Sequence, residues 1–433
     1  MQGAALRIGS VAAGGDGALM LARLTSTAWL VAGVWLTMRL ALLLAPRRRS
    51  TGALRSPGRA WIAGTAGLVV AATPSLSHLG GLVFNDVPAF TLSTACLLVG
   101  VTTAMSGITT RRLLLLGGVL GAAALTRVSC LPAVAIAALL TGYGAWHHGI
   151  GIPRGRRALV AIGASLPLVP AVAFWLRNIA LYGDLTASAT LLAKFDRDLN
   201  DPVSQLLVDR MFWLRLWNRM AADLTTGHWA VGLRANLTEL LLLAALTGLG
   251  VILWRLRDPG RPITWLRNPR AVSWALCLLL PAALLASTVQ FHAAGGSLHG
   301  RYLLGGHAVT ATVLVIALVQ LPRVGRPLAL AAPAVLLVVS GFLLQGMRLH
   351  HAAIWARSGI EMELPMLTGS ATDGLVLVCT MLAWGLLGLA TVQRLRDRSG
   401  VVVDRDDSDP SNRSDPSHQG TRRIRSIRES AAA

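Results

Sequence analysis

The chain alternates between apolar blocks of about 20 residues and short joints that are rich in arginine. A helix of that length crosses a hydrocarbon core of about 30 Å, so each block predicts a transmembrane helix. Charged residues make up only 14% of the chain, against about 25% in a typical soluble domain. The pattern excludes a soluble fold and predicts an all-α, polytopic transmembrane bundle.

We expect about eleven transmembrane helices on this criterion. They are expected at 24–45, 60–82, 88–106, 113–126, 129–146, 158–181, 236–254, 271–291, 302–321, 328–347 and 372–393. The fourth and fifth blocks are short, and the junction at Arg127 and Pro132 also fits a broken or re-entrant helix.

Arginine is confined largely to alternate joints. The joints concerned carry Arg47, Arg48, Arg49, Arg55, Arg59, Arg111, Arg112, Arg154, Arg156, Arg157, Arg255, Arg257, Arg261, Arg267, Arg270, Arg323 and Arg326. Positive charge in short loops marks the cytoplasmic side of a membrane. We therefore expect a multi-pass protein of the plasma membrane with a cytoplasmic C-terminus. The net charge of +20 then reflects orientation, and nucleic acid is not an expected partner because no compact basic domain is present.

The two ends of the chain follow from this topology. An odd number of spans puts residues 1–23 outside as a short N-terminus, whereas polytopic proteins usually start inside. We expect that a first helix and the outer loop after it are missing; the alternative is a genuine outside N-terminus. Residues 24–393 form the transmembrane domain. The polar tail 394–433 is expected to be a disordered cytoplasmic segment.

The segment 182–235 is the longest expected outer joint. Within it, 203–224 has apolar residues at helical spacing on one side, including Trp213 and Trp217, and Arg215 on the other. This pattern predicts an amphipathic helix. It fits a helix lying flat in the headgroup region and, equally, a helix packed on the bundle.

Few polar groups are available for chemistry, and the first is Asn85-Asp86, just before Pro88 at the start of the third span. A carboxylate there could accept a proton from an acceptor hydroxyl or hold a divalent metal ion. The competing interpretation is that both side chains serve the free amide groups at a helix start.

Several arginines are expected near the same outer surface. Arg177 and Asn178 close the sixth span, where a charge is costly unless it meets a partner such as a lipid phosphate. Arg301 and Tyr302 open the ninth span, and Arg127 ends the fourth. Arginine suits phosphate oxygens because its donors form a fork. Interfacial anchoring is the competing interpretation for the Arg177 segment.

Metal and thiol chemistry find little support in the sequence. Three histidines near the ninth span, His292, His299 and His307, are spread across a loop, so they do not predict a metal site. The cysteines lie in or beside apolar blocks without a C-x-x-C pair, as expected of small buried residues. We therefore predict no metal ligands.

Five short segments, in chain order, resemble motifs of the GT-C superfamily of polytopic glycosyltransferases. The closest likeness is to the dolichyl-phosphate-mannose-protein mannosyltransferase (family 39-like) enzymes and the related bacterial DUF2142 membrane proteins. The segments are Ala22 to Ser26 (ARLTS), Asn85 to Pro88 (NDVP), Gly118 to Arg127 (GVLGAAALTR), Arg177 to Asp184 (RNIALYGD) and Gly300 to Leu304 (GRYLL).

The resemblance implies a membrane glycosyltransferase that uses a polyprenyl-phosphate sugar as donor and an envelope polysaccharide, lipid or protein as acceptor. It implies that Arg127, Arg177, Asn178, Arg301 and Tyr302 bind the donor phosphate. The family's catalytic base usually lies in the first outer loop, which residues 1–23 do not supply. Asp86 is the best remaining carboxylate, in a supporting or catalytic role.

Two alternatives to an active transferase remain. One is a non-catalytic or degenerate membrane protein of the same fold. The other is a transporter or flippase, which would need polar residues near the middle of several spans, where only Arg39 and His307 occur.

Overall fold

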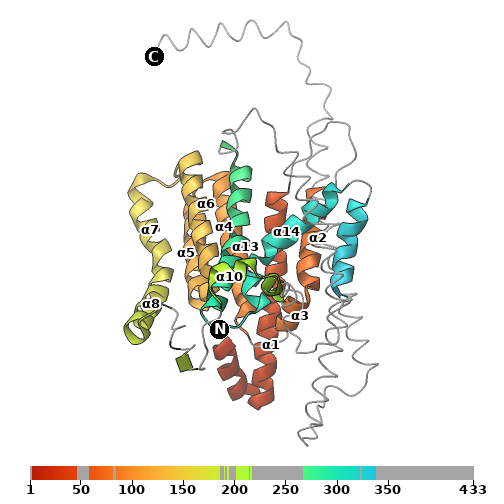
Figure 1. The fold of residues 1–433 in the computed structure, drawn as a ribbon. Helices are drawn as coiled ribbons and strands as arrows, with labels where there is room; N and C mark the ends of the chain where they lie inside the picture. The colour runs from red at the N-terminus through yellow and green to blue at the C-terminus, as the bar shows by residue number, and fades with distance from the viewer. Residues whose placement is uncertain are drawn as a thin grey trace, which may run out of the picture.

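The computed structural model shows a bundle of helices that run roughly along one axis (Figure 1). It describes residues 2–45, 58–80, 84–185, 190, 193–194, 201–213, 215–216, 267–321 and 324–337. The main elements are α1 (Gln2–Leu44), α2 (Arg59–Ala72), α3 (Pro74–Gly80), α4 (Asp86–Ser106), α5 (Thr110–Thr126), η1 (Val128–Cys130), α6 (Leu131–His148), η2 (Arg154–Arg156), α7 (Arg157–Ser165), η3 (Leu166–Leu168), α8 (Val169–Tyr182), α10 (Val203–Val208), α13 (Pro269–Ala293), η6 (Gly300–Gly306) and α14 (His307–Gln320).

Within the described ranges, six helical segments are long and apolar enough to cross a membrane. They are Leu21–Leu44, Asp86–Ser106, Val128–His148, Arg154–Tyr182, Pro269–Ala293 and Gly300–Gln320. The predicted all-α, polytopic transmembrane fold is therefore confirmed. The count of about eleven stays a prediction, because the spans expected at 236–254 and 372–393 and the tail 394–433 lie outside the described residues.

Two of the expected spans are interrupted part-way along their length. The block 60–82 divides at Thr73, where α2 ends and α3 begins at Pro74. The block 158–181 contains a 3₁₀ turn, η3, between α7 and α8, with Pro167 inside it. Proline has no N–H to donate and clashes with the preceding turn, so it interrupts a helix. In addition, α1 begins at Gln2, well before the expected start at residue 24.

Helix α4 forms the centre of the bundle. Of the 18-residue apolar stretch that qualifies it as a membrane span, which we call its apolar window, 78% is buried. It contacts α1, α5, α6 and α13. Its contact with α6 is close because glycines replace side chains there. A Cβ on Gly100 would lie 3.0 Å from the Ala137 Cα, and one on Gly144 would lie 2.5 Å from the Thr103 carbonyl oxygen.

The segment Arg154–Tyr182, which comprises η2, α7, η3 and α8, forms an edge of the bundle. Only 17% of its apolar window is buried. It packs mainly on α5 and stands at the left of the view (Figure 1). Gly117 and Gly121 make that contact possible because they have no Cβ. A Cβ on Gly117 would lie 1.9 Å from the Ala164 carbonyl oxygen, and one on Gly121 would lie 2.2 Å from the Pro167 carbonyl oxygen.

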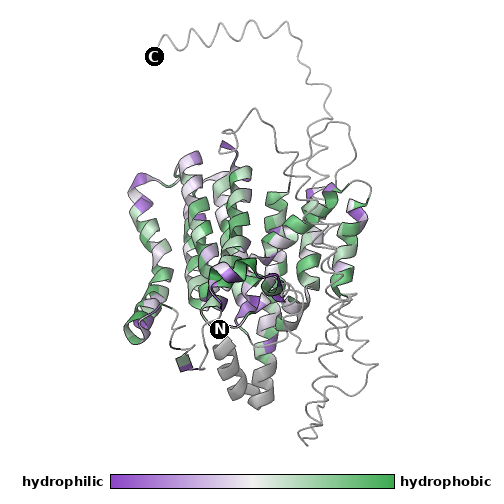
Figure 2. Ribbon diagram, viewed as in Figure 1, coloured by the Kyte–Doolittle hydropathy of each residue, from purple (hydrophilic) through white to green (hydrophobic). Residues whose placement is uncertain are grey.

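The arginine-rich joints that are described lie together at one end of the bundle, which we call the arginine end. The Arg59 side chain donates to the carbonyl oxygen of Leu42, and Trp274 donates to that of Leu44 at 2.9 Å, which brings together one end of α1, α2 and α13. Arg112 donates to the carbonyl oxygens of Ser106 and Gly107 at 2.9 and 2.8 Å. Hydrophilic residues stand at the upper tips of the helices in Figure 2.

The expected amphipathic helix 203–224 is broken. Helix α10 ends at Val208, and the Asp209 carboxylate caps the next turn by accepting from the backbone N–H groups of Met211 and Phe212 at 2.8 and 2.9 Å. A single continuous helix is therefore wrong, because Asp209 starts a second one. The side chains of Leu206, Phe212 and Leu216 pack with those of Val289 and Leu298. Of the two predicted placements, the described part shows the helix packed on the bundle.

Candidate functional site

The candidate site lies at the end of the bundle opposite the arginine end, where α4 begins. Asp86 is the first residue of α4 and is only 3% exposed. The preceding residue, Asn85, donates from its amide to the Thr126 carbonyl oxygen at the end of α5 at 3.4 Å. The start of α4 is thereby held against the junction of α5 and α6.

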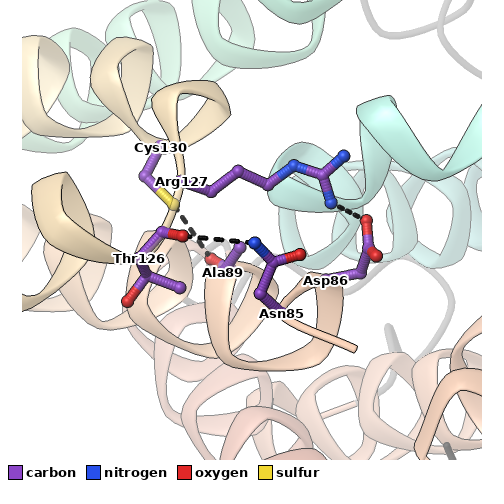
Figure 3. Close-up of polar contacts among 6 residues, drawn as sticks. All are labelled: Asn85, Asp86, Ala89, Thr126, Arg127 and Cys130. Atoms are coloured by element: carbon purple, nitrogen blue, oxygen red, sulfur yellow. Dashed lines mark hydrogen bonds and ion pairs between the residues drawn. The ribbon is translucent and has the colours of Figure 1, made fainter. Parts of the chain in front are cut away.

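Asp86 forms an ion pair with Arg127 (Figure 3). Arg127 lies in the one-residue joint between α5 and η1, with an extended backbone at φ −166° and ψ 141°. Its N–H donates to the Ala123 carbonyl oxygen at 3.3 Å, and its own carbonyl oxygen accepts from Cys130 at 3.0 Å. Because the backbone is tied at both sides, the side chain has a defined direction toward α4. The Arg127 side chain is 18% exposed.

Arg301 and Tyr302 approach the same ion pair from η6. The Arg127 Cζ atom lies 5.3 Å from the centroid of the Tyr302 ring, and the Arg301 Cζ atom lies 5.8 Å from it. Arg301 also lies 5.9 Å from the ring centroid of Phe84. Distances below about 6 Å between a guanidinium and a ring face are in the range of cation–π attraction. The two aromatic rings therefore help to hold two arginines close together.

Three charged side chains meet at this site. Two guanidinium groups, of Arg127 and Arg301, stand near the single carboxylate of Asp86. Burial lowers the pKa of Arg127 from its usual value, and the positive charge of Arg301 lowers it further. The two guanidinium groups therefore repel each other, and an anionic ligand that contacts both would be favoured.

The structure does not bring Arg177 and Asn178 to this group. Both lie on α8, at the edge of the bundle, and Arg177 is exposed. Asn178 is buried, and its amide donates to the Leu185 carbonyl oxygen at 3.1 Å, which closes the turn after α8. Within the described part of the chain, Arg177 makes no hydrogen bond or ion pair with Asp86, Arg127 or Arg301.

The three histidines near η6 each have a local partner. His292 shares a hydrogen bond with the Gly296 carbonyl oxygen at 2.8 Å, and the His299 ring lies 5.7 Å from the Tyr302 ring. His307 lies 2.8 Å from the Thr73 hydroxyl. That hydroxyl donates to the Val69 carbonyl oxygen, so Nε2 of His307 must carry the proton of this bond. Among the described residues, no three metal-ligating side chains gather.

Two features of the site escaped the sequence analysis. The pairing of Asp86 with Arg127 was not predicted, although each residue was singled out by itself. Phe84, which directly precedes the segment Asn85 to Pro88, was not singled out, although it lies beside Arg301. The available signal was that all these residues lie within, or directly beside, three of the five resembling segments.

Comparison with known proteins gives structural likeness only. No protein family matches the sequence, and no curated protein sequence matches it either. The structure is similar to that of ArnT from Cupriavidus metallidurans in the apo state, with a TM-score of 0.44 and 14% identity over 91% of this chain and 66% of that one. It is also similar to ArnT from the same organism bound to undecaprenyl phosphate, with a TM-score of 0.41 and 16% identity over 93% of this chain and 62% of that one. The chain spans less than two thirds of the length of each ArnT chain.

Proposed function

We propose that this protein is a membrane glycosyltransferase of the GT-C type that transfers a sugar from a polyprenyl-phosphate donor to a cell-envelope acceptor at the outer face of the plasma membrane. One observation carries the proposal. Residues from three separate resembling segments, represented by Asp86, Arg127 and Arg301, meet at one end of the bundle. Residues far apart in sequence are thus gathered where an outer-leaflet lipid headgroup would lie.

In this proposal Arg127 and Arg301 bind the donor phosphate. The fork of a guanidinium group matches phosphate oxygens, and a fixed positive charge stabilises the negative charge that grows on a leaving phosphate. Tyr302 holds both arginines at its ring. The acceptor hydroxyl would attack the anomeric carbon with inversion, and the polyprenyl phosphate would leave with the bonding electrons. Because that leaving group is good, positioning and one base would be sufficient.

We assign Asp86 a positioning role. Its carboxylate is buried and paired with Arg127, and an opposite charge in contact favours the ionised form of a carboxylate, which makes it a weaker base. The pair instead sets the direction of the Arg127 guanidinium. In the resembling family the catalytic base lies in a first outer loop, and we assign that role to no residue named above.

The proposal is tested with the full-length protein reconstituted in lipid nanodiscs and supplied with a defined polyprenyl-phosphate sugar. Arg301→Ala should abolish sugar transfer while the protein still inserts and keeps its helical content. Arg154→Gln, a matched loss of one arginine at the arginine end, should transfer sugar as the unchanged protein does. Transfer that persists in Arg301→Ala would remove Arg301 from the site.

A second function is favoured by the ion pair itself. Because Asp86 is paired with Arg127, it is a weaker base. The same cluster therefore also fits a non-catalytic protein that binds lipid-linked phosphate. Binding of polyprenyl phosphate that depends on Arg301, together with no transfer to any envelope acceptor fraction, would support this function over the enzymatic one.

A further inference from the structure

A groove on the surface of α5 lies outside the candidate site. It has a volume of about 730 Å³ and is lined by Thr110, Arg111, Leu114, Leu115, Gly118 and Val119. These positions follow the helical spacing of i, i+4 and i+8, so they share one face of α5. A Cβ on Gly118 would meet nothing within 4 Å, which shows that the groove is open at that point. We call this feature the α5 groove.

The α5 groove is polar at one end only. Thr110 and Arg111 lie at the start of α5, in the arginine end of the bundle, whereas the other four residues are apolar or glycine. Leu114 and Leu115 are 42% and 49% exposed. A shallow, open apolar groove that ends at one cation is complementary to a molecule with a hydrocarbon chain and an anionic head.

Arg111 differs from its neighbours in what it binds. Arg112 donates to the carbonyl oxygens of Ser106 and Gly107, and Arg157 donates to those of Ile152 and Ile150. Arg111 is exposed and, within the described part of the chain, makes no hydrogen bond or ion pair. Its neighbours therefore stabilise the joints, while Arg111 keeps its guanidinium available at the mouth of the groove.

The level of Arg111 in the membrane is indicated by the neighbouring helix. The joint after α6 lies against the joint before α5, since the Gly151 N–H donates to the Ile108 carbonyl oxygen at 3.1 Å. Near the end of α6, Tyr143, Trp146 and His147 form an aromatic cluster, and Trp146 is 70% exposed. Exposed tryptophan and tyrosine mark the headgroup level of a bilayer. Arg111 therefore lies where phospholipid headgroups begin.

The length of the groove agrees with this placement. Thr110 to Val119 spans nine helical steps, or about 13.5 Å at about 1.5 Å per residue. One leaflet contributes about half of a hydrocarbon core of about 30 Å. The groove is therefore about as long as the acyl region of a single leaflet.

We propose that the α5 groove binds an anionic phospholipid of the leaflet at the arginine end. Its phosphate lies against Arg111 and the Thr110 hydroxyl, and one acyl chain lies along Leu114, Leu115 and Val119 beside Gly118. The site is separate from the candidate site at the opposite end, and it does not depend on sugar transfer.

The test measures phospholipid retained by the purified full-length protein in native mass spectrometry. The probes are phosphatidylglycerol and phosphatidylcholine with identical acyl chains. The unchanged protein should retain more phosphatidylglycerol. Arg111→Gln should reduce its retention by about tenfold, the effect of losing one charge-assisted hydrogen bond, to the level of phosphatidylcholine. Arg154→Gln removes an exposed arginine from the same end and should retain phosphatidylglycerol unchanged.

A second variant tests the apolar part of the groove without altering its charge. Gly118→Leu places a side chain in the open space and should reduce retention of both lipids. Equal retention of the two lipids by the unchanged protein, or equal losses in Arg111→Gln and Arg154→Gln, would overturn the proposal. So would a dimer that Gly118→Leu separates while lipid retention stays the same, because a second copy of the chain would then be the occupant.

Discussion

Similar residues have different surroundings at the centre and at the edge of the bundle. In α4, at the centre, 78% of the apolar window is buried, against 17% in the edge segment Arg154–Tyr182. Arg127, beside the centre, meets Asp86 and the Tyr302 ring. Arg177, at the edge, is exposed on α8. Two arginines with the same predicted role thus differ in their surroundings: Arg127 contacts other residues of the candidate site, and Arg177 does not.

The difference also appears in the apolar surface. At the edge, Leu159, Leu166 and Leu176 are 72%, 60% and 61% exposed. In a bilayer such exposure carries no hydrophobic penalty, because lipid chains are as apolar as leucine. The edge therefore needs few protein contacts to be stable. The centre, in contrast, is closely packed, and its polar side chains are satisfied within their own helix. The Thr94 hydroxyl donates to the Phe90 carbonyl oxygen, and the Thr103 hydroxyl donates to that of Val99.

The largest effect is expected from breaking the ion pair at the centre. Asp86→Asn removes the buried carboxylate that pairs with Arg127, whose side chain is 18% exposed, so the free energy of unfolding should fall by about 3 kcal/mol, the lower end of the range for breaking a buried pair. Asp201→Asn, at an exposed carboxylate, is the control and should change it little. Unfolding by detergent titration measures both. A loss in Asp86→Asn no larger than in the control would show that the centre tolerates an unpaired charge.

Affinity for polyprenyl phosphate should separate the two arginines directly. Arg301→Gln removes a donor of charge-assisted hydrogen bonds, which are worth about 1.5–3 kcal/mol, so binding should weaken about tenfold to hundredfold. Arg177→Gln should weaken it by less than about twofold. Binding is measured by fluorescence quenching or native mass spectrometry. If Arg177→Gln is as harmful as Arg301→Gln, the edge belongs to the site after all.

The junction between centre and edge can be tested at two adjacent glycines. A Cβ on Gly117 would lie 1.9 Å from the Ala164 carbonyl oxygen of α7, whereas one on Gly118 would meet nothing within 4 Å. Gly117→Ala should therefore destabilise the protein by about 1–3 kcal/mol through overpacking. Gly118→Ala should be neutral or slightly stabilising, since alanine favours a helix more than glycine. Thermal unfolding measures the stability of both variants, and equal melting temperatures would contradict the close contact at Gly117.

The smallest effect is expected at Asn178. Its hydrogen bond to the Leu185 carbonyl oxygen closes a local turn, so Asn178→Ala should cost about 1 kcal/mol of stability. The affinity for polyprenyl phosphate should not change. A variant with normal stability and weaker lipid binding would restore the role that the family resemblance implies for this residue.

Sequence patterns predicted the level of residues in the membrane better than their direction around the bundle. The expected spans 88–106 and 271–291 lie within two residues of α4 (Asp86–Ser106) and α13 (Pro269–Ala293), because hydrophobic thickness limits helix length. The contact of Asp86 with Arg127 was not predictable in this way. It depends on which helices are neighbours, and a hydropathy pattern carries no such information.

The breaks in the helices show a second limit of sequence reasoning. The division at Thr73 and the 3₁₀ turn at Pro167 lie inside continuous apolar blocks, so composition alone gave no boundary. Proline was visible at both places, but many transmembrane helices continue through a proline, as α13 does at Pro281. Whether a proline divides a helix depends on which neighbouring groups satisfy the freed backbone.

The bond between His307 and Thr73 has a consequence for biosynthesis. The two residues are 234 positions apart, so the ribosome needs roughly 10–50 s to travel from one to the other at about 5–20 residues per second. Thr73 is thus synthesised well before His307 emerges. Because the bond to Thr73 can form only when α14 packs beside α2, the late helix α14 completes a contact whose first half is made early in synthesis.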